Sequence, residues 1–231
     1  MYIIACPTLE FYMNVSSIGL VYVTTLLGWN MIIIVKWKGS VSLAIKIFID
    51  QGHNPTGYHN TGATGNGLLE QDITYQVGVY LANLLNNDPR FDARLSRPTP
   101  TTVLGTTNAT SLAERVRMAN EWPADYFISI HCNSNPNPSI NGTEIYLYQF
   151  NTQAQWLAQR IMTGIVEMVG TKNNGIRLNP SLYVLRRTNM PSLLIELGYL
   201  TNSSDAQKLR DDQYQFAYGI YLGIMRYFGF A

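Results

Sequence analysis

Residues 50–70, DQGHNPTGYHNTGATGNGLLE, separate a short β-branched run from the start of a helical pattern. The stretch holds five glycines and two histidines, and almost no side chain that could fill a core. A connection of this length inside a compact domain is uncommon and is usually functional or disordered. Its two ends carry His53 and Glu70, and imidazole and carboxylate groups are both ligands of zinc. We therefore predict a metal-binding loop whose missing ligand and catalytic base come from elsewhere in the chain.

The composition fits one folded domain. The chain has 231 residues, of which 46% are hydrophobic and 13% are charged, which excludes a disordered chain. The formal net charge of +1 leaves no basic footprint for nucleic acid, and two cysteines provide no disulfide framework. The histidines are His53, His59 and His131. Any metal site that uses imidazole ligands must therefore draw on these three.

The first 42 residues differ in character from the rest. Residues 11–35 contain no charged side chain, and an apolar run of this length can span a bilayer. The flanks do not fit a secretory signal, because no basic residue precedes the run and no Ala-x-Ala site follows it. Basic residues follow it instead, which would leave the next domain cytoplasmic. We predict that residues 1–42 are a membrane anchor or a mis-assigned start, in preference to a buried helix or strand pair.

Beyond this segment, strand-like runs alternate with helical patterns. The predicted strands cover residues 46–50, 91–97, 126–131, 143–148, 182–185 and 193–197. The predicted helices cover residues 69–87, 111–122 after a capping box at Ser111 and Glu114, 153–169, and a last helix from about residue 213. Crossovers of this length allow parallel pairing. The expected fold class is α/β, a single-domain, twisted and mostly parallel sheet with helices on both faces.

Four ionisable residues fall at element ends that such a sheet brings together. His53 follows the first predicted strand, His131 ends the third, Glu196 ends the last, and Glu70 starts the first helix. In open α/β sheets, sites form outside the carboxyl ends of the strands. We therefore expect these four side chains on one rim of the sheet, although they are far apart in sequence.

The residue types indicate a zinc hydrolase. Two imidazoles and a carboxylate are a known ligand set for catalytic zinc, with water in the fourth position. Zinc would lower the pKa of that water from about 15.7 to about 7. Glu196 follows the apolar residues 193–195 and is the candidate general base, since burial raises the pKa of a carboxyl group.

Other residues near these positions keep two interpretations. His59 is either a solvated loop residue or the true third ligand. Asp50 either accepts a hydrogen bond from a ligand imidazole or shapes the turn. Glu144 lies in a predicted strand and either reaches the site or is paired at the surface. Cys132 should point to the face of its strand opposite that of its histidine neighbour, so a thiol nucleophile is not expected.

Several motif blocks occur in a fixed order along the chain. They are Asp50-Gln-Gly-His53, Leu69-Glu70, Ser129-Ile-His131-Cys-Asn133, Gly142-Thr-Glu144, Val184-Leu-Arg186 and Pro191-Ser-Leu-Leu-Ile-Glu196-Leu-Gly-Tyr-Leu-Thr-Asn202. Together they resemble the type 3 N-acetylmuramoyl-L-alanine amidases, and the resemblance covers residues 46–229. This chain departs from the family pattern at Asn54-Pro55, where a second glycine usually follows the first histidine, and at Cys132, where an alanine-like residue is usual.

The resemblance implies a zinc enzyme that hydrolyses the amide between the lactyl group of N-acetylmuramic acid and the L-alanine of the peptidoglycan stem peptide. It implies His53, Glu70 and His131 as ligands of one Zn²⁺ per chain, and Glu196 as the catalytic glutamate. The zinc-dependent amidase catalytic domain is then residues 43–231. The alternatives are a zinc peptidase that acts within the stem peptide and a catalytically silent wall-binding protein.

The expected partner is peptidoglycan, not nucleic acid, and we expect a monomer. We expect action on the cell wall from the cell envelope, with membrane anchoring through residues 11–35. The alternative is a cytoplasmic protein that reaches the wall when the cell lyses.

Overall fold

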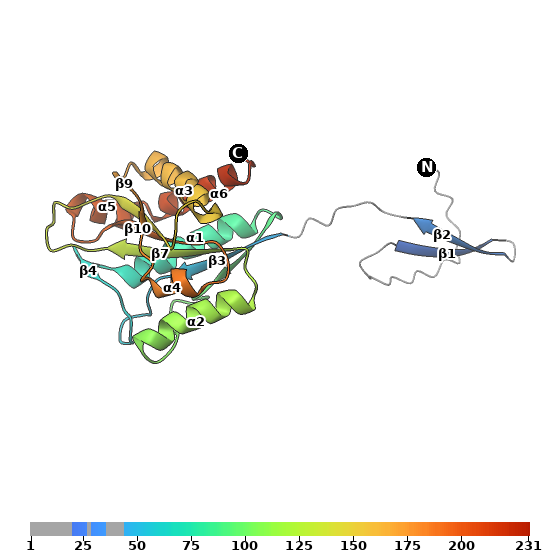
Figure 1. Cartoon of the computed structure of the whole chain (residues 1–231), viewed down its shortest axis with the longest axis horizontal. Helices are drawn as coiled ribbons and strands as arrows, with labels where there is room; N and C mark the ends of the chain where they lie inside the picture. The colour runs from blue at the N-terminus through green and yellow to red at the C-terminus, as the bar shows by residue number, and fades with distance from the viewer. Residues whose placement is uncertain (1–19, 27–28, 36–43) are drawn as a thin grey trace. The chain divides into compact units, whose positions relative to one another are not determined.

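The structure is a computed structural model that describes residues 20–26, 29–35 and 44–231. It divides into two units, Met1–Leu43 and Ala44–Ala231 (Figure 1). Most of the predicted hydrophobic segment, residues 1–42, lies outside the described residues.

The described part of the first unit is a β-hairpin. Strand β1 (Leu20–Leu26) pairs antiparallel with β2 (Trp29–Val35). In the part of the chain that the structure describes, no helix combines the length and the apolar character needed to cross a bilayer. Membrane anchoring through residues 11–35 therefore stays a prediction.

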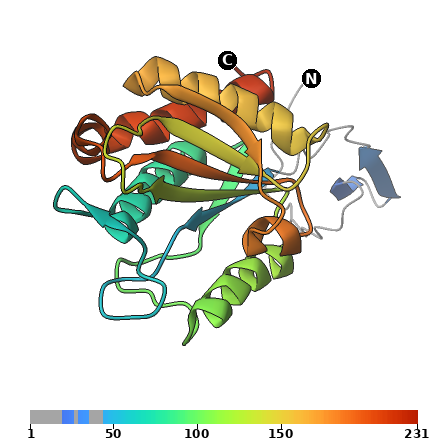
Figure 2. The same ribbon diagram turned by 60° about the vertical axis from the view of Figure 1, so that its left-hand side comes forward.

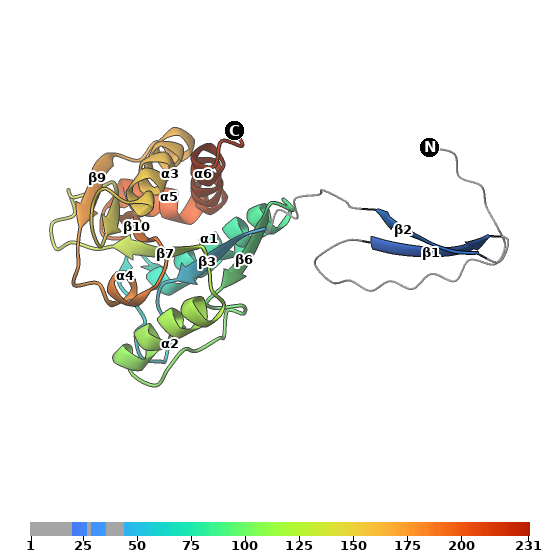
Figure 3. The same ribbon diagram turned by 45° about the vertical axis from the view of Figure 1, so that its right-hand side comes forward.

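A six-stranded sheet forms the centre of the second unit, in the order β6-β3-β7-β10-β8-β9. Its strands are β3 (Ile45–Gln51), β6 (Phe91–Leu95), β7 (Tyr126–Asn133), β8 (Thr143–Leu147), β9 (Asn173–Leu178) and β10 (Ser192–Tyr199). Strands β6, β3, β7 and β10 are parallel, while β8 pairs antiparallel with β10, and β9 pairs parallel with β8. Figure 3 shows β6 and β9 toward opposite ends of the sheet. A small hairpin, β4 (Thr64–Gly65) with β5 (Leu68–Leu69), lies in the loop after β3.

Helices cover both faces of this sheet, which confirms the predicted α/β class (Figure 2). They are α1 (Glu70–Asn86), α2 (Asn108–Glu121), α3 (Gln153–Val169), α4 (Tyr183–Arg187), α5 (Ser203–Asp211) and α6 (Gln213–Tyr227). Helices α1, α3 and α6 enclose a large core on one face, and α2 and α4 enclose a smaller core on the other.

Alternating side chains of the strands supply both cores. On β3, Ile47 and Ile49 pack in the large core, whereas Phe48 packs in the smaller one. On β10, Ile195 belongs to the large core and Leu194 to the smaller one. Because side chains alternate along a strand, Glu196 lies on the same face as Leu194, beyond the smaller core. The smaller core thus ends where the polar side chains at the carboxyl end of β10 begin.

The structure corrects two predicted elements. Residues 182–185, predicted as a strand, belong to helix α4, where Val184 and Leu185 are buried together in the smaller core. A four-residue apolar run does not distinguish a strand from a buried helical turn. The helix predicted to start at Ser111 starts earlier, at Asn108, because Thr107 and Thr110 form the capping box. Strand β9 and helix α5 were not predicted from the sequence.

Candidate metal centre and active site

The loop after β3 begins with an unusual backbone conformation at His53. Its φ angle is +72°, a left-handed value that is uncommon for a residue other than glycine. Two buried arginines bind its carbonyl oxygen, Arg115 through Nη2 at 2.6 Å and Arg97 through Nη1 at 3.4 Å. Backbone strain of this kind persists only where the surroundings enforce it, and such positions cluster at functional sites.

Arg115 is itself held by a buried ion pair. Its Nη1 lies 2.5 Å from Asp50 Oδ1, and both side chains are 1% exposed. Ser129 Oγ donates to Asp50 Oδ2 at 2.8 Å. Burial raises the pKa of Asp50, but the charge and the hydrogen bond of Arg115 outweigh it, so the pKa lies below its ordinary value. These contacts agree with the turn-shaping role of Asp50, because both its oxygens are engaged by groups other than an imidazole.

We expect Arg115→Met to lower the free energy of unfolding by about 3–5 kcal/mol, because it leaves the buried carboxylate of Asp50 without its partner. Urea unfolding at neutral pH measures this. The control is Arg117→Met on the same helix, whose exposed ion pairs with Glu114 and Glu121 should contribute about 0–1 kcal/mol. Equal losses in the two variants would contradict the structural role of Arg115.

The same variant predicts a pH dependence. A carboxyl group with a lowered folded-state pKa stabilises the fold above its unfolded pKa of about 3.9 and loses this contribution as the pH falls through the folded value. The pKa of Asp50 is lowered in the folded state, mainly by Arg115 acting against burial. The stability difference between the natural protein and Arg115→Met should therefore shrink in acid.

Three predicted ligands meet at the carboxyl ends of the strands. His53, Glu70 and His131 each offer one ligand atom, and these atoms lie within 4.8 Å of one another. Glu70 Oε1 is 3.0 Å from His53 Nε2 and 3.0 Å from His131 Nδ1. The two imidazole rings are arranged edge to face with centroids 4.7 Å apart. The side chain of Glu70 is buried, while both imidazoles are partly exposed.

Neighbouring groups orient the donor atoms of His53 and Glu70. His53 Nδ1 lies 3.2 Å from the carbonyl oxygen and 3.1 Å from Oδ1 of Asn60, which leaves Nε2 to face Glu70. Histidine ligands of metals commonly use their second ring nitrogen in this way. The backbone N–H of Ala63 donates to Glu70 Oε2 at 2.8 Å, and that of Cys132 donates to Oε1 at 3.0 Å.

Two glycines make room for these donors. A Cβ atom at Gly62 would lie 2.7 Å from both Glu70 Oε2 and His53 Cδ2, and Gly62 has a φ angle of +81°. A Cβ atom at Gly52 would lie 2.5 Å from Cε1 of His131. A side chain at either position would displace a donor, so glycine is required by the packing as well as by the turn at Gly62.

This donor set fits a zinc ion. Its composition is that of a catalytic zinc site with three protein ligands. Burial raises the pKa of Glu70, but hydrogen bonds with His131 and His53 outweigh burial and hold the pKa well below its ordinary value. Glu70 is therefore an ionised carboxylate, which is the form that binds a cation.

Glu196 lies beside this cluster. On β10 it is in register with His131 of β7 on one side and with Glu144 of β8 on the other. Its side chain is partly exposed, but Oε2 is enclosed and has no hydrogen-bond partner among the described residues. Burial, followed by the charges of Glu70 and Glu144, raises the pKa of Glu196 well above its ordinary value. A raised pKa favours the protonated form of this carboxyl group, which suits a group that accepts a proton during a reaction.

The structure decides between the two interpretations of His59 and shows the surroundings of Cys132. His59 is exposed and its side chain lies outside the donor cluster, so it is not the third ligand of this group. Cys132 is buried in the large core, on the opposite face of β7 from His131, and burial raises the pKa of its thiol. The expectation against a thiol nucleophile agrees with this position.

Asn54 supports the loop structurally, a role that the sequence did not indicate beyond the departure from the family pattern. Its side chain is fully buried. Its Nδ2 donates to the carbonyl oxygens of His59 at 3.0 Å and Leu104 at 2.9 Å, and its Oδ1 accepts from the backbone N–H of Leu104 at 3.0 Å. Asn54 therefore ties the ligand-bearing loop to the segment before α2, which is the work of a side chain that glycine lacks.

Comparisons with known proteins identify the family of the chain. The sequence model of the N-acetylmuramoyl-L-alanine amidase family matches residues 47–226. The N-acetylmuramoyl-L-alanine amidase LytC of Bacillus subtilis (strain 168) is 37% identical over 174 residues, which cover 73% of this chain and 32% of that protein. The amidase CwlM of Bacillus licheniformis is 37% identical over 172 residues, which cover 74% of this chain and 62% of that protein. The chain thus spans less than two thirds of these two relatives.

A solved structure shares the fold of the second unit. The crystal structure of N-acetylmuramoyl-L-alanine amidase from Clostridium difficile 630 superposes with a TM-score of 0.71 at 33% identity. The superposition covers 80% of this chain and 97% of that one.

Proposed function

We propose that this chain, which belongs to the N-acetylmuramoyl-L-alanine amidase family, is a zinc-dependent peptidoglycan amidase. The bond cleaved is the amide between the lactyl group of N-acetylmuramic acid and the first residue, L-alanine, of the stem peptide. The proposal rests on one observation: donor atoms of His53, Glu70 and His131 lie within 4.8 Å of one another.

These three side chains would hold one zinc ion, and when bound it would activate water and polarise the amide carbonyl. The remaining steps belong to the protein. Glu196 accepts a proton from the attacking water while the hydroxyl joins the lactyl carbonyl carbon. The carbon–nitrogen bond then breaks, and Glu196 returns the proton to the leaving nitrogen of L-alanine. The enclosed Oε2, with no partner among the described residues, suits a proton carrier of this kind.

Digestion of purified cell wall tests this proposal. We expect free stem peptides that begin with L-alanine, together with glycan strands that carry no peptide, identified by mass spectrometry. Cleavage between amino acids of the stem would instead identify the alternative, a zinc peptidase. Binding to the wall with no new fragments would identify a catalytically silent wall-binding protein, and released disaccharides would exclude all three.

The location, the oligomeric state and the domain division of the enzyme are part of the same proposal. We place its action on the cell wall, at the cell envelope or after release at lysis, and we propose a monomer. The division into residues 1–42 and a catalytic domain, 43–231, is part of it. Mass spectrometry of the protein purified from its own cells gives the mature N-terminus. Residues 1–42 serve as an anchor only if they are present there and the protein sediments with membranes.

A further inference from the structure

A further buried carboxylate, Glu144 on β8, lies directly opposite Glu196 on β10. Residues opposed in this way place their Cβ atoms about 5 Å apart on the same face of the sheet. The two carboxylates have contrasting surroundings. Glu196 Oε2 has no partner among the described residues, whereas both oxygens of Glu144 accept hydrogen bonds.

The partners of Glu144 leave it acting as an acceptor only. Tyr146 donates to Oε2 at 2.6 Å, and Tyr199 donates to Oε1 at 2.8 Å. Burial and the bond to Glu144 raise the pKa of Tyr146 to about 12, and the same causes raise that of Tyr199, so both phenols stay protonated and donate.

The third partner of Glu144 is an arginine that reaches solvent. Nη2 of Arg177, on β9, lies 3.3 Å from Glu144 Oε1, and the Arg177 side chain is 51% exposed. Among the described residues, the polar contacts of Arg177 all fall on this nitrogen, with a weak second bond to the carbonyl of Asn174 at 3.4 Å. The Nε and Nη1 hydrogens are therefore left for a ligand. A guanidinium is a permanent cation, so each of these hydrogens can give a charge-assisted hydrogen bond to a carboxylate oxygen.

Strand register places this guanidinium on the active-site face. Arg177 is opposite Tyr146, Tyr146 is two residues from Glu144, and Glu144 is opposite Glu196. All four side chains therefore point to the same side of the sheet. The register continues from Glu196 to the predicted ligand His131 on β7. The metal cluster and the exposed cation thus lie on the two sides of Glu196 on the same face of the sheet, with Arg177 in the neighbouring row, opposite Tyr146.

We propose that Arg177 determines substrate specificity by binding a carboxylate of the stem peptide, and that the buried Glu144 positions Arg177 for this contact. The inference rests on the proposed amidase function. The substrate of that reaction carries free carboxylates on only one side of the scissile bond. The lactyl carboxyl of N-acetylmuramic acid is consumed in the amide that is cut, so the free carboxylates of the substrate belong to the peptide.

Four synthetic N-acetylmuramoyl peptides test the proposal. One pair carries a carboxylate or a carboxamide on the residue after L-alanine, and the second pair carries them one residue further along. The natural protein should hydrolyse the carboxylate member of one pair with a kcat/KM about three- to tenfold higher, expressed mainly in KM. The pair that shows the preference identifies the carboxylate. In Arg177→Gln this ratio should fall to about one, and Arg177→Lys should retain part of it.

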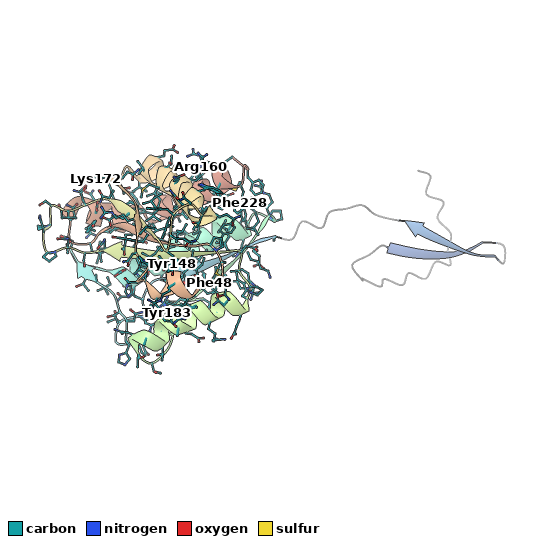
Figure 4. The ribbon with its side chains drawn as sticks, in the orientation of Figure 1. Phe48, Tyr148, Arg160, Lys172, Tyr183 and Phe228 are labelled. Atoms are coloured by element: carbon teal, nitrogen blue, oxygen red, sulfur yellow. The ribbon has the colours of Figure 1, made fainter. Side chains whose placement is uncertain are left out.

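The preference is the ratio of two kcat/KM values measured on the same variant, so a general loss of activity leaves this ratio unchanged. Arg160→Gln is the matched control, because Arg160 is exposed on α3, which covers the opposite face (Figure 4). Glu144→Gln should weaken the preference, and adding it to Arg177→Gln should cause no further loss of preference, because both changes remove the same contact.

Two outcomes would overturn the inference. One is a natural protein without a preference. The other is an Arg177→Gln variant that keeps the preference; if free N-acetylmuramic acid then inhibits this variant more weakly, the arginine binds the released lactyl carboxylate instead. Failure of the natural protein to cut any of the four peptides would instead refute the proposed function.

Discussion

Glu196→Gln is expected to lower kcat by about 10²–10⁴-fold, the usual contribution of a general acid–base group, while the protein keeps its metal. Glutamine preserves the size of the side chain but neither accepts the proton of the attacking water nor delivers one to the leaving nitrogen. Because Glu196 Oε2 has no hydrogen-bond partner among the described residues, the substitution breaks no bond of that oxygen. The fold should therefore be little affected.

Three measurements on this variant separate catalysis from structure. Release of L-alanine-terminated peptide gives kcat, elemental analysis gives zinc per chain, and thermal unfolding reports the fold. Glu167→Gln removes an exposed carboxylate that is paired with Arg226 on the distant helical layer, and it should leave all three unchanged. A Glu196→Gln protein with undiminished turnover would remove this residue from the mechanism. Loss of zinc in the same variant would make it a ligand instead.

The sheet topology predicted that the candidate site residues would lie at one edge of the sheet. Parallel strands place their carboxyl ends on one edge, so residues that end different strands meet whatever their separation in sequence. His53 and His131 follow this rule, Glu70 joins them from the start of α1, and the structure brings the three donor atoms together. The glycine-rich composition of residues 50–70 also indicated a backbone with special conformations, although it did not say which glycines face the donors.

The residues that position the site were harder to predict from the sequence. The left-handed backbone at His53 depends on Arg115, which comes from a helix 62 positions away, and no local pattern reports such a pairing. Strand β9 begins Asn173-Asn174-Gly175, which hides the alternation that identifies a strand. Because β9 was missed, Arg177 had no predicted place beside the site. Sequence reasoning thus found the groups that perform chemistry more readily than those that position them.

Removal of the metal is expected to abolish turnover, and the histidines allow a matched test of which residues hold it. His131→Ala removes one of three donors, so zinc affinity should fall by more than the roughly 10–100-fold that loss of a supporting partner costs. His59→Ala removes an exposed imidazole of the same loop that lies outside the donor cluster, and it should bind zinc normally. The pair separates a specific site from general binding of zinc to histidine.

The test starts from apo-protein prepared with a chelator. Zinc is added back while bound metal, thermal unfolding and turnover are followed together. The natural protein and His59→Ala should bind one zinc per chain and recover activity. Zinc should also raise their unfolding temperature, since a ligand that binds the folded state stabilises it by mass action. For His131→Ala all three responses should be weak or absent. Full activity of the apo-protein, or equal zinc binding by the two histidine variants, would contradict a centre built from His53, Glu70 and His131. Because ligands bind zinc only when deprotonated, affinity of the natural protein should also decrease as the pH is lowered.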